Sequence, residues 1–290
     1  MIQIRNEFLT AEIDEKGAQL SKLSSASAEY IYDDPAVWNK HAPVLFPFAG
    51  RLKDQKFLYR GKEYGPVLIH GFAPYADYVP EDRTPSSVRM RLAVTDEIRA
   101  IWPFDFAFSV QFSLRDSTLF VSYLVENLGG DPMYYGLGSH PGFNVPLKAG
   151  LRFEDYYVEF PEAGTLLRNE MSAACLSLGT RSPYERAVGN RIPLTHDLFD
   201  NDAVILSGTG KTAVLATEKD RRKVIVSFPD TAYCALWHKV RTEAPFLCIE
   251  PWTSLPGPEG RLADLEHSAD YNLLQPGQSR THHLDITILD

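Results

Sequence analysis

Alternation of apolar and polar residues with a period of two is the feature of this sequence that most restricts its fold. It runs through residues 2–14, 87–94, 106–114, 118–127 and 283–288, each of strand length. Side chains of a β-strand point alternately to the two faces of a sheet, so the pattern predicts half-buried strands. Gly, Pro, Asn and Asp residues separate these runs and predict tight turns between neighbouring strands.

Helical signals are few. Residues 94–104 (VTDEIRAIWPF) predict one short helix, which Thr95 caps and Trp102-Pro103 ends. Strand-plus-turn units of about 8–12 residues predict roughly two dozen strands, so we expect an all-β fold, a large antiparallel β-sandwich of two curved sheets. No linker or internal repeat is visible, and residues 1–290 are expected to form a single domain. Residues 161–200 are less regular and predict a loop-rich excursion.

Charge and cysteine content restrict the class of partner. The formal net charge is −9 and no basic block exceeds the triplet at 221–223, so no nucleic-acid partner is expected. Cys175, Cys234 and Cys248 lack CxxC spacing, which favours a reducing cytoplasm. No apolar run has the length of a membrane span, and residues 1–14 lack the apolar core of a signal peptide. We therefore expect a cytoplasmic protein without a membrane partner.

Two histidines end apolar segments next to glycines. His140 lies in GSHPGFN, where Pro141 keeps its predecessor out of the α region. His70 precedes Gly71, whose missing side chain would let another backbone or a ligand approach closely. Both positions suit proton chemistry at a strand end. The alternatives are a histidine satisfied by a neighbouring carbonyl at residue 70 and a plain glycine-rich turn at residue 140.

A carboxylate interrupts the apolar run FLCIEPW. Burial of Glu250 is costly unless it is paired or has a chemical role, and burial raises a carboxyl pKa toward the range of a useful base. The alternative is a structural pair with an arginine. Arg51, in a polar turn after an apolar segment, could be that partner or could clamp hydroxyls or a carboxylate. Asp200 and Asp202 lead into a strand, and their Asp-Asn-Asp run is also an ordinary turn signature.

The ordered motifs APVLFPFAGRL, HGF, WPFDF, GSHPGFNVP, LFDNDAVIL and APFLCIEPW resemble the aldose 1-epimerase (mutarotase) family. The likeness is greatest to the LacX-like branch of the galactose mutarotase-like β-supersandwich proteins, and it runs from about residue 13 through the last strand. The resemblance implies an isomerase that interconverts the α and β anomers of an aldohexose. It implies a small-molecule sugar as partner, and no metal or other cofactor.

The same resemblance assigns residues to roles. It implies Glu250 as the base that takes the proton of the C1 hydroxyl. His140 is expected to be the acid that protonates the ring oxygen, with its pKa raised by the nearby carboxylate, and His70 to hold and polarise that oxygen. The matching motifs imply Arg51, and Asp202 in preference to Asp200, as substrate-binding residues. Phe72 and Trp252 are expected to bind the sugar as well, because aromatic faces beside hydrogen-bonding groups suit a sugar ring.

The chain departs from the galactose enzymes of the family at several positions. It lacks an Asn-Arg pair after the Gly-Arg turn, it has Trp252 where they tend to have Gln, and it has Pro74 where many relatives have Arg. The sugar, and whether it carries a phosphate, stay open. Two other functions are weighed: a non-catalytic carbohydrate-binding protein, and a metal-dependent enzyme with His70, His140 and Glu250 as a two-His-one-carboxylate site.

Overall fold

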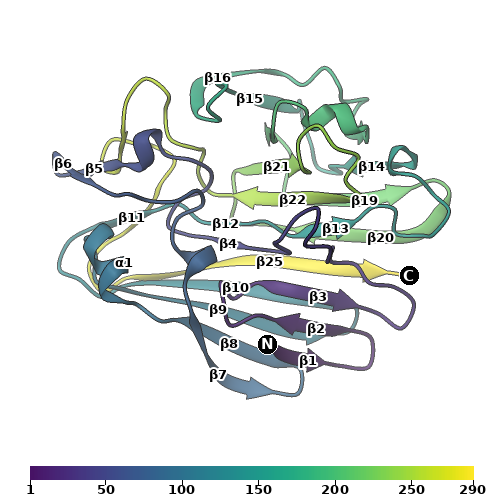
Figure 1. Ribbon diagram of the computed structural model, residues 1–290, viewed down its shortest axis with the longest axis horizontal. Helices are drawn as coiled ribbons and strands as arrows, with labels where there is room; N and C mark the ends of the chain where they lie inside the picture. Colours follow the sequence, from purple (N-terminus) through teal and green to yellow (C-terminus); the bar gives the residue numbers. More distant parts are fainter.

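The computed structural model describes residues 1–290 and consists almost entirely of β-strands (Figure 1). The largest sheet has nine strands, all paired antiparallel with their neighbours. In spatial order they are β17 (Arg191–Pro193), β14 (Tyr156–Glu159), β19 (Thr212–Thr217), β20 (Asp220–Ser227), β25 (Ser279–Leu289), β10 (Thr118–Asn127), β9 (Phe106–Arg115), β8 (Ser87–Leu92) and β7 (Tyr78–Thr84).

A second sheet of eight strands lies against the first. Its order is β16 (Ser177–Pro183), β15 (Leu167–Met171), β18 (Val204–Ser207), β21 (Tyr233–Trp237), β22 (Phe246–Trp252), β12 (Gly138–Ser139) and β4 (Val44–Leu45), and β13 (Gly142–Asn144) also pairs with β22. Strand β22 therefore has hydrogen-bonded neighbours on both sides.

Short elements complete the fold. The small sheets are β1 (Ile2–Arg5), β2 (Thr10–Ile13) and β3 (Leu20–Ser24); β11 (Met133–Tyr135) and β24 (Asn272–Leu274); and β23 (Ala263–Asp264), β5 (Phe57–Tyr59) and β6 (Lys62–Tyr64). The helical pieces are α1 (Asp96–Ile101) and the 3₁₀ turns η1 (Lys53–Gln55), η2 (Ala73–Tyr75), η3 (Phe153–Asp155) and η4 (His196–Phe199). No helix is both long and apolar enough to cross a membrane.

The core lies between the two large sheets. Burial alternates at every position of β10, as its sequence pattern predicts. Its inward residues Leu119 and Val121 belong to one cluster of 69 buried residues, which also contains Leu247 and Ile249 of β22. The two sheets thus share one apolar layer, and the predicted antiparallel β-sandwich is confirmed.

Strand β22 is buried on both faces, which explains its almost continuous apolar sequence. Leu247 and Ile249 point into the shared core. The alternate residues Cys248 and Trp252 belong to smaller clusters on the other face of the sheet. Because side chains alternate along a strand, Glu250 also points to that outer face, away from the main core.

The helix prediction is confirmed in detail. Helix α1 spans Asp96–Ile101, the Thr95 hydroxyl accepts a hydrogen bond from the Ile98 N–H at 3.4 Å, and Trp102 is the C-cap. The prediction of a loop-rich stretch at 161–200 is partly wrong, because β15 and β16 pair there. Strand β16 is mostly exposed and lies at the edge of its sheet. Because neither of its faces packs on the core, its sequence does not need to alternate between apolar and polar residues.

Gly71 brings the His70 turn against the second sheet. It pairs as an isolated parallel bridge with Phe46, beside β4, and its φ is +79°. A Cβ at this position would lie 2.2 Å from the Phe46 carbonyl oxygen, so only glycine permits the contact. His70 itself has φ +67° and lies in a turn, so the prediction that it ends a strand is wrong.

Phe46 holds this junction by packing, and we predict that Phe46→Ala lowers the free energy of unfolding by about 3–5 kcal/mol. Its ring is fully buried and contacts those of Phe72, Phe108 and Tyr135. Urea unfolding measures the change, with Phe8→Ala as the control. Because Phe8 is 48% exposed, that variant is expected to change the free energy by no more than about 0.5 kcal/mol. Equal effects of the two substitutions would contradict this account.

Candidate active site

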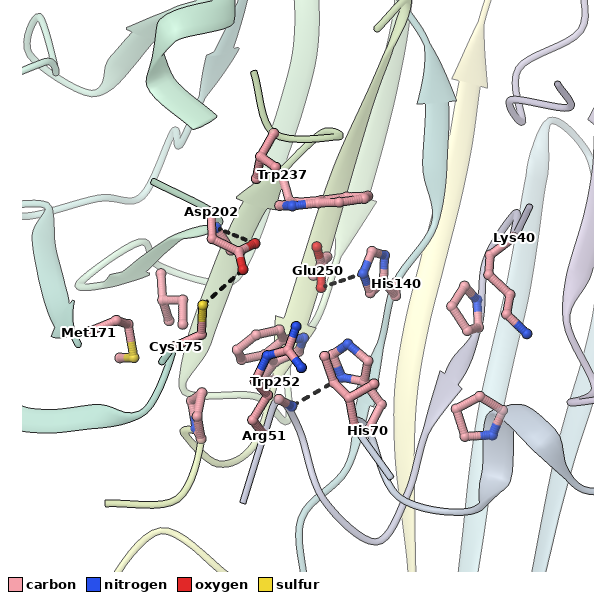
Figure 2. Close-up of a pocket in the computed structure, with 18 of the residues that line it drawn as sticks. Lys40, Arg51, His70, His140, Met171, Cys175, Asp202, Trp237, Glu250 and Trp252 are labelled. Atoms are coloured by element: carbon pink, nitrogen blue, oxygen red, sulfur yellow. Dashed lines mark hydrogen bonds and ion pairs between the residues drawn. The ribbon is translucent and has the colours of Figure 1, made fainter. Parts of the chain in front are cut away.

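A cavity of about 370 Å³ opens on the outer face of the second sheet. Glu250 and Trp252 reach it from β22, and His140 reaches it from the turn between β12 and β13. Three more of the predicted residues line it from segments outside the regular strands (Figure 2): Arg51, His70 and Asp202. Six of the seven predicted site residues therefore meet in one place, although they are scattered over the chain.

Phe72 does not line this cavity. Its side chain is 8% exposed and packs in the main core, with its ring 5.7 Å from that of Phe46 and 6.2 Å from that of Trp102. We therefore correct the expectation that Phe72 contacts the ligand. The turn at His70–Gly71 directs the histidine to the cavity and the following phenylalanine to the core.

Glu250 and His140 form the centre of the site. His140 Nε2 lies 3.2 Å from Glu250 Oε2, and the two residues are 7% and 1% exposed. Arg51 makes no ion pair, so the alternative of a structural Glu250–arginine pair is wrong. The tight turn at 140–142 brings the imidazole to the carboxyl group, and Gly142 leaves space there for Trp38. A Cβ on Gly142 would lie 2.6 Å from the Trp38 ring.

Burial shifts the two groups in opposite directions. Loss of solvent raises the pKa of Glu250 well above its ordinary 4.5, and the negative charge of Asp202 raises it further. Loss of solvent also lowers the pKa of His140 to about 3. The predicted upward shift of the histidine pKa is therefore wrong. Burial disfavours the charged form of each group, so it favours a neutral carboxyl beside a neutral imidazole.

His70 is held as a neutral hydrogen-bond donor. Its Nδ1 accepts a hydrogen bond from the Gly50 N–H at 3.0 Å, which leaves the ring proton on Nε2. Burial lowers the pKa of His70 well below 6.5, and the neighbouring His140 and Arg51 lower it further. Protonation at Nδ1 would break the bond to Gly50. His70 can therefore donate a hydrogen bond to a ligand but is poorly suited to carrying protons.

Aromatic rings form the walls around the pair. Trp38 stacks on His140 at 5.3 Å between centroids, and Trp237 meets the same imidazole edge-on at 5.7 Å. The buried Trp252 Nε1 and His140 Nδ1 have no hydrogen-bond partner in the protein. Flat apolar surfaces beside unpartnered polar atoms suit a ring that is apolar on its faces and polar at its rim.

Asp202 is fixed by two donors. One carboxylate oxygen accepts from the Cys175 thiol at 2.9 Å and the other from the Ala203 N–H at 3.0 Å. Asp200 is exposed and does not line the cavity, so the geometry favours Asp202 of the two. The sequence offered no sign of Cys175 in this position, because the contact joins two loops that are distant in the chain.

One group of side chains could hold a metal ion. The ligand atoms of His140, Cys248 and Glu250 all lie within 4.8 Å of one another, and all three residues are buried. Burial raises the pKa of the Cys248 thiol well above its ordinary 9, so a metal would have to displace a proton that is firmly held. His70 is not in this group, and the two-His-one-carboxylate site with His70 is therefore not formed.

Comparison with known proteins now decides the family. The aldose 1-epimerase family model matches residues 1–287. The chain belongs to the aldose 1-epimerase family. Among curated proteins it is similar to the plasmid-borne and chromosomal forms of protein LacX from Lactococcus lactis subsp. lactis. The identity to each is 29%, over all of this chain and 99% of the relative.

Solved structures agree with this family assignment. A galactose mutarotase-like protein from Lactobacillus casei is 32% identical, with a TM-score of 0.93 and full coverage of both chains. A galactose mutarotase related enzyme from Lactobacillus acidophilus has the same identity and TM-score, over all of this chain and 97% of the other. A putative aldose 1-epimerase from Escherichia coli K12 is 17% identical with a TM-score of 0.78, over 99% and 98% of the two chains, and shows the shared fold alone.

The site predicts an unusual stability profile. We expect Glu250→Gln to make the protein more stable than wild type at pH 8, by an amount that shrinks toward pH 5. The pKa of Glu250 is higher in the folded than in the unfolded protein, so the folded state binds more protons between the two values. Wild-type stability therefore falls as pH rises through that window. Glutamine has no proton to lose in this pH range. The difference in free energy of unfolding between the variant and wild type therefore grows by up to about 1.4 kcal/mol for each unit of rising pH.

Urea unfolding of the two proteins between pH 5 and pH 8 measures this difference. Glu185→Gln serves as the control, since Glu185 is exposed and forms no ion pair or side-chain hydrogen bond. That variant should follow the wild-type curve. If the free energies of unfolding of Glu250→Gln and wild type changed with pH in parallel, the pKa of Glu250 would not be raised in the folded protein.

Proposed function

We propose that this protein is a cofactor-independent aldose 1-epimerase that interconverts the α and β anomers of an aldohexose. The observation that carries the proposal is the 3.2 Å contact between Glu250 and His140 on the wall of a sugar-sized cavity. Mutarotation opens and closes a cyclic hemiacetal, which requires one proton to leave an oxygen on C1 and another to reach the ring oxygen. These two oxygens are bonded to the same carbon, so a base and an acid in contact can serve both.

In ring opening, Glu250 as carboxylate takes the proton of the C1 hydroxyl. The bond between C1 and the ring oxygen breaks, C1 becomes the aldehyde carbon, and protonated His140 donates its proton to the departing oxygen. Rotation about the C1–C2 bond then presents the other face of the aldehyde. Closure reverses the transfers: His140 takes the proton of the attacking hydroxyl, and Glu250 returns a proton to the oxygen on C1.

The opposite pKa shifts make the neutral form of the pair the more stable one, and ring opening starts from the charged form. With the cyclic sugar the pair must be charged, whereas after opening Glu250 is protonated and His140 is neutral. Burial of both residues favours that neutral form. The proton count of the pair is the same in both forms, and one proton moved across the 3.2 Å contact converts one into the other. Forming the charged pair from the neutral one costs free energy, and ring opening returns that free energy when the pair becomes neutral again.

The surrounding residues are assigned to binding. His70, with its proton on Nε2, donates to the ring oxygen and holds it near His140. Arg51 and Asp202 bind ring hydroxyls from two sides of the cavity, one as a donor and the other as an acceptor. Trp252, which lines the cavity, offers an apolar face to the sugar ring. We also propose that residues 1–290 act as one domain in the cytoplasm, in accord with three free cysteines.

Glu250→Gln is expected to lower the rate of mutarotation by about 10²–10⁴-fold, because glutamine cannot accept the C1 proton. Polarimetry on freshly dissolved α-glucose and α-galactose measures the rate. Sugar binding, measured by calorimetry, should persist, because the amide keeps the shape of the side chain. Glu185→Gln, on the exposed surface, is the control and should keep the wild-type rate.

Three other outcomes would redirect the proposal. Full activity of Glu250→Gln would remove this residue from the mechanism. Sugar binding without mutarotation by the wild-type protein would favour a non-catalytic carbohydrate-binding protein. Stoichiometric iron, manganese or zinc in the purified protein, with activity lost on chelation, would favour a metal-dependent enzyme built on His140, Cys248 and Glu250.

A further inference from the structure

The cavity contains a cation with no anionic partner. Lys40 lines it, yet its ammonium group makes no ion pair and no hydrogen bond within the protein. The contact it makes is with the face of the Tyr75 ring, 5.1 Å from Nζ to the centroid. Partial burial lowers the pKa of Lys40, and the positive charge of Lys16 lowers it further. An ammonium has three donors, and no acceptor of the protein takes a hydrogen bond from this one, so they are available to an anion in the cavity.

The chain around Lys40 is held firmly in place. On one side, the Trp38 ring stacks on His140 at 5.3 Å and on Phe246 at 5.2 Å. On the other side, the His41 N–H donates to the Gln19 side-chain oxygen at 2.8 Å. The lysine is therefore presented at a defined place on the cavity wall, which lowers the entropy cost of binding a ligand group there.

The position of Lys40 relative to the reacting pair indicates which part of a sugar it meets. In Figure 2 the Glu250–His140 pair lies between Lys40 at one end of the cavity and Asp202 at the other. In a pyranose, C6 branches from the carbon next to the ring oxygen, whereas the C2 and C3 hydroxyls lie on the other side of C1. With C1 and the ring oxygen at the pair and the hydroxyls toward Asp202, C6 points toward Lys40.

We propose that the cavity takes an aldose with an anionic group on C6, a phosphate or a carboxylate, and that Lys40 binds this anion. The inference rests on the proposed function for the orientation of C1. The charges of the cavity wall support it: Lys40 and Arg51 are both unpaired cations, and the acids there are Asp202 and Glu250, whose pKa burial raises. Lys40 is favoured over the exposed Arg51 because its partly buried ammonium is less solvated and has no anionic partner.

Anomer exchange of three sugars tests this inference. NMR exchange spectroscopy gives kcat/KM for glucose, glucose 6-phosphate and glucuronate, and wild type is expected to prefer at least one of the two anions to glucose. In Lys40→Met the ratio of the anionic to the neutral value should fall by about 10–100-fold, the usual effect of losing a charge-assisted hydrogen bond. Lys40→Arg should retain most of the preference. Preference for the phosphate or for the carboxylate identifies the source of the anion.

Lys62→Met is the matched control. Lys62 likewise forms no ion pair and lies over a tyrosine ring, with Nζ 4.9 Å from the Tyr64 centroid, but it is outside the cavity. This variant should keep the wild-type ratio. The inference is overturned if wild type prefers glucose to both anions, or if Lys40→Met keeps the anionic preference, which would then belong to Arg51.

A binding measurement separates this inference from the proposed function. Calorimetry with 1,5-anhydroglucitol 6-phosphate, which has no C1 hydroxyl and cannot mutarotate, reports anion recognition alone. Binding that Lys40→Met weakens, without exchange of any sugar, would support the anion site and reject the epimerase. Exchange of glucose with equal affinities for 1,5-anhydroglucitol and its 6-phosphate would support the epimerase and reject the anion site.

Discussion

The contact between a buried carboxyl group and a buried imidazole is the interaction on which the rest of the site depends. In water, a glutamate is charged at neutral pH and a histidine is partly so. Inside this protein the loss of solvent raises the pKa of Glu250 and lowers that of His140, so that one proton stays on the pair in its neutral form. One member is then a donor and the other an acceptor, 3.2 Å apart. A reaction that must run equally well from either anomer requires a pair that can exchange these roles.

The packing of the two sheets makes it possible to bury this pair. Strand β22 is hydrogen-bonded on both sides, and its residues Leu247 and Ile249 anchor it in the main core. The opposite face of the same strand is thereby free to carry Glu250. Across the ladder the carboxyl-bearing residue faces Ala235, whose small side chain leaves room above the sheet. Burial of the large apolar layer on the other side of the strand thus offsets the energetic cost of burying an ionisable group.

The cavity is also asymmetric along its length. An acceptor, Asp202, is held at one end by a thiol and a backbone N–H, and an unpartnered ammonium, Lys40, stands at the other. Donors and acceptors placed at opposite ends orient a ligand more strongly than aromatic walls do, because stacking tolerates rotation of the ring. In the proposed function, this difference in charge would orient the sugar and so decide which of its atoms meet the Glu250–His140 pair.

The sequence by itself determined the features that depend on residues close together in the chain. Alternation identified the strands, Thr95 identified the start of the helix, and the place of Glu250 within an apolar strand indicated a buried carboxyl group. The ordered motifs indicated the family. Tertiary structure alone decided that His140 meets Glu250, because their contact depends on strand pairing between distant parts of the chain. It also decided the direction of the histidine pKa shift and the burial of Phe72. Desolvation and side-chain direction depend on every atom packed around a group, and the local sequence does not record those atoms.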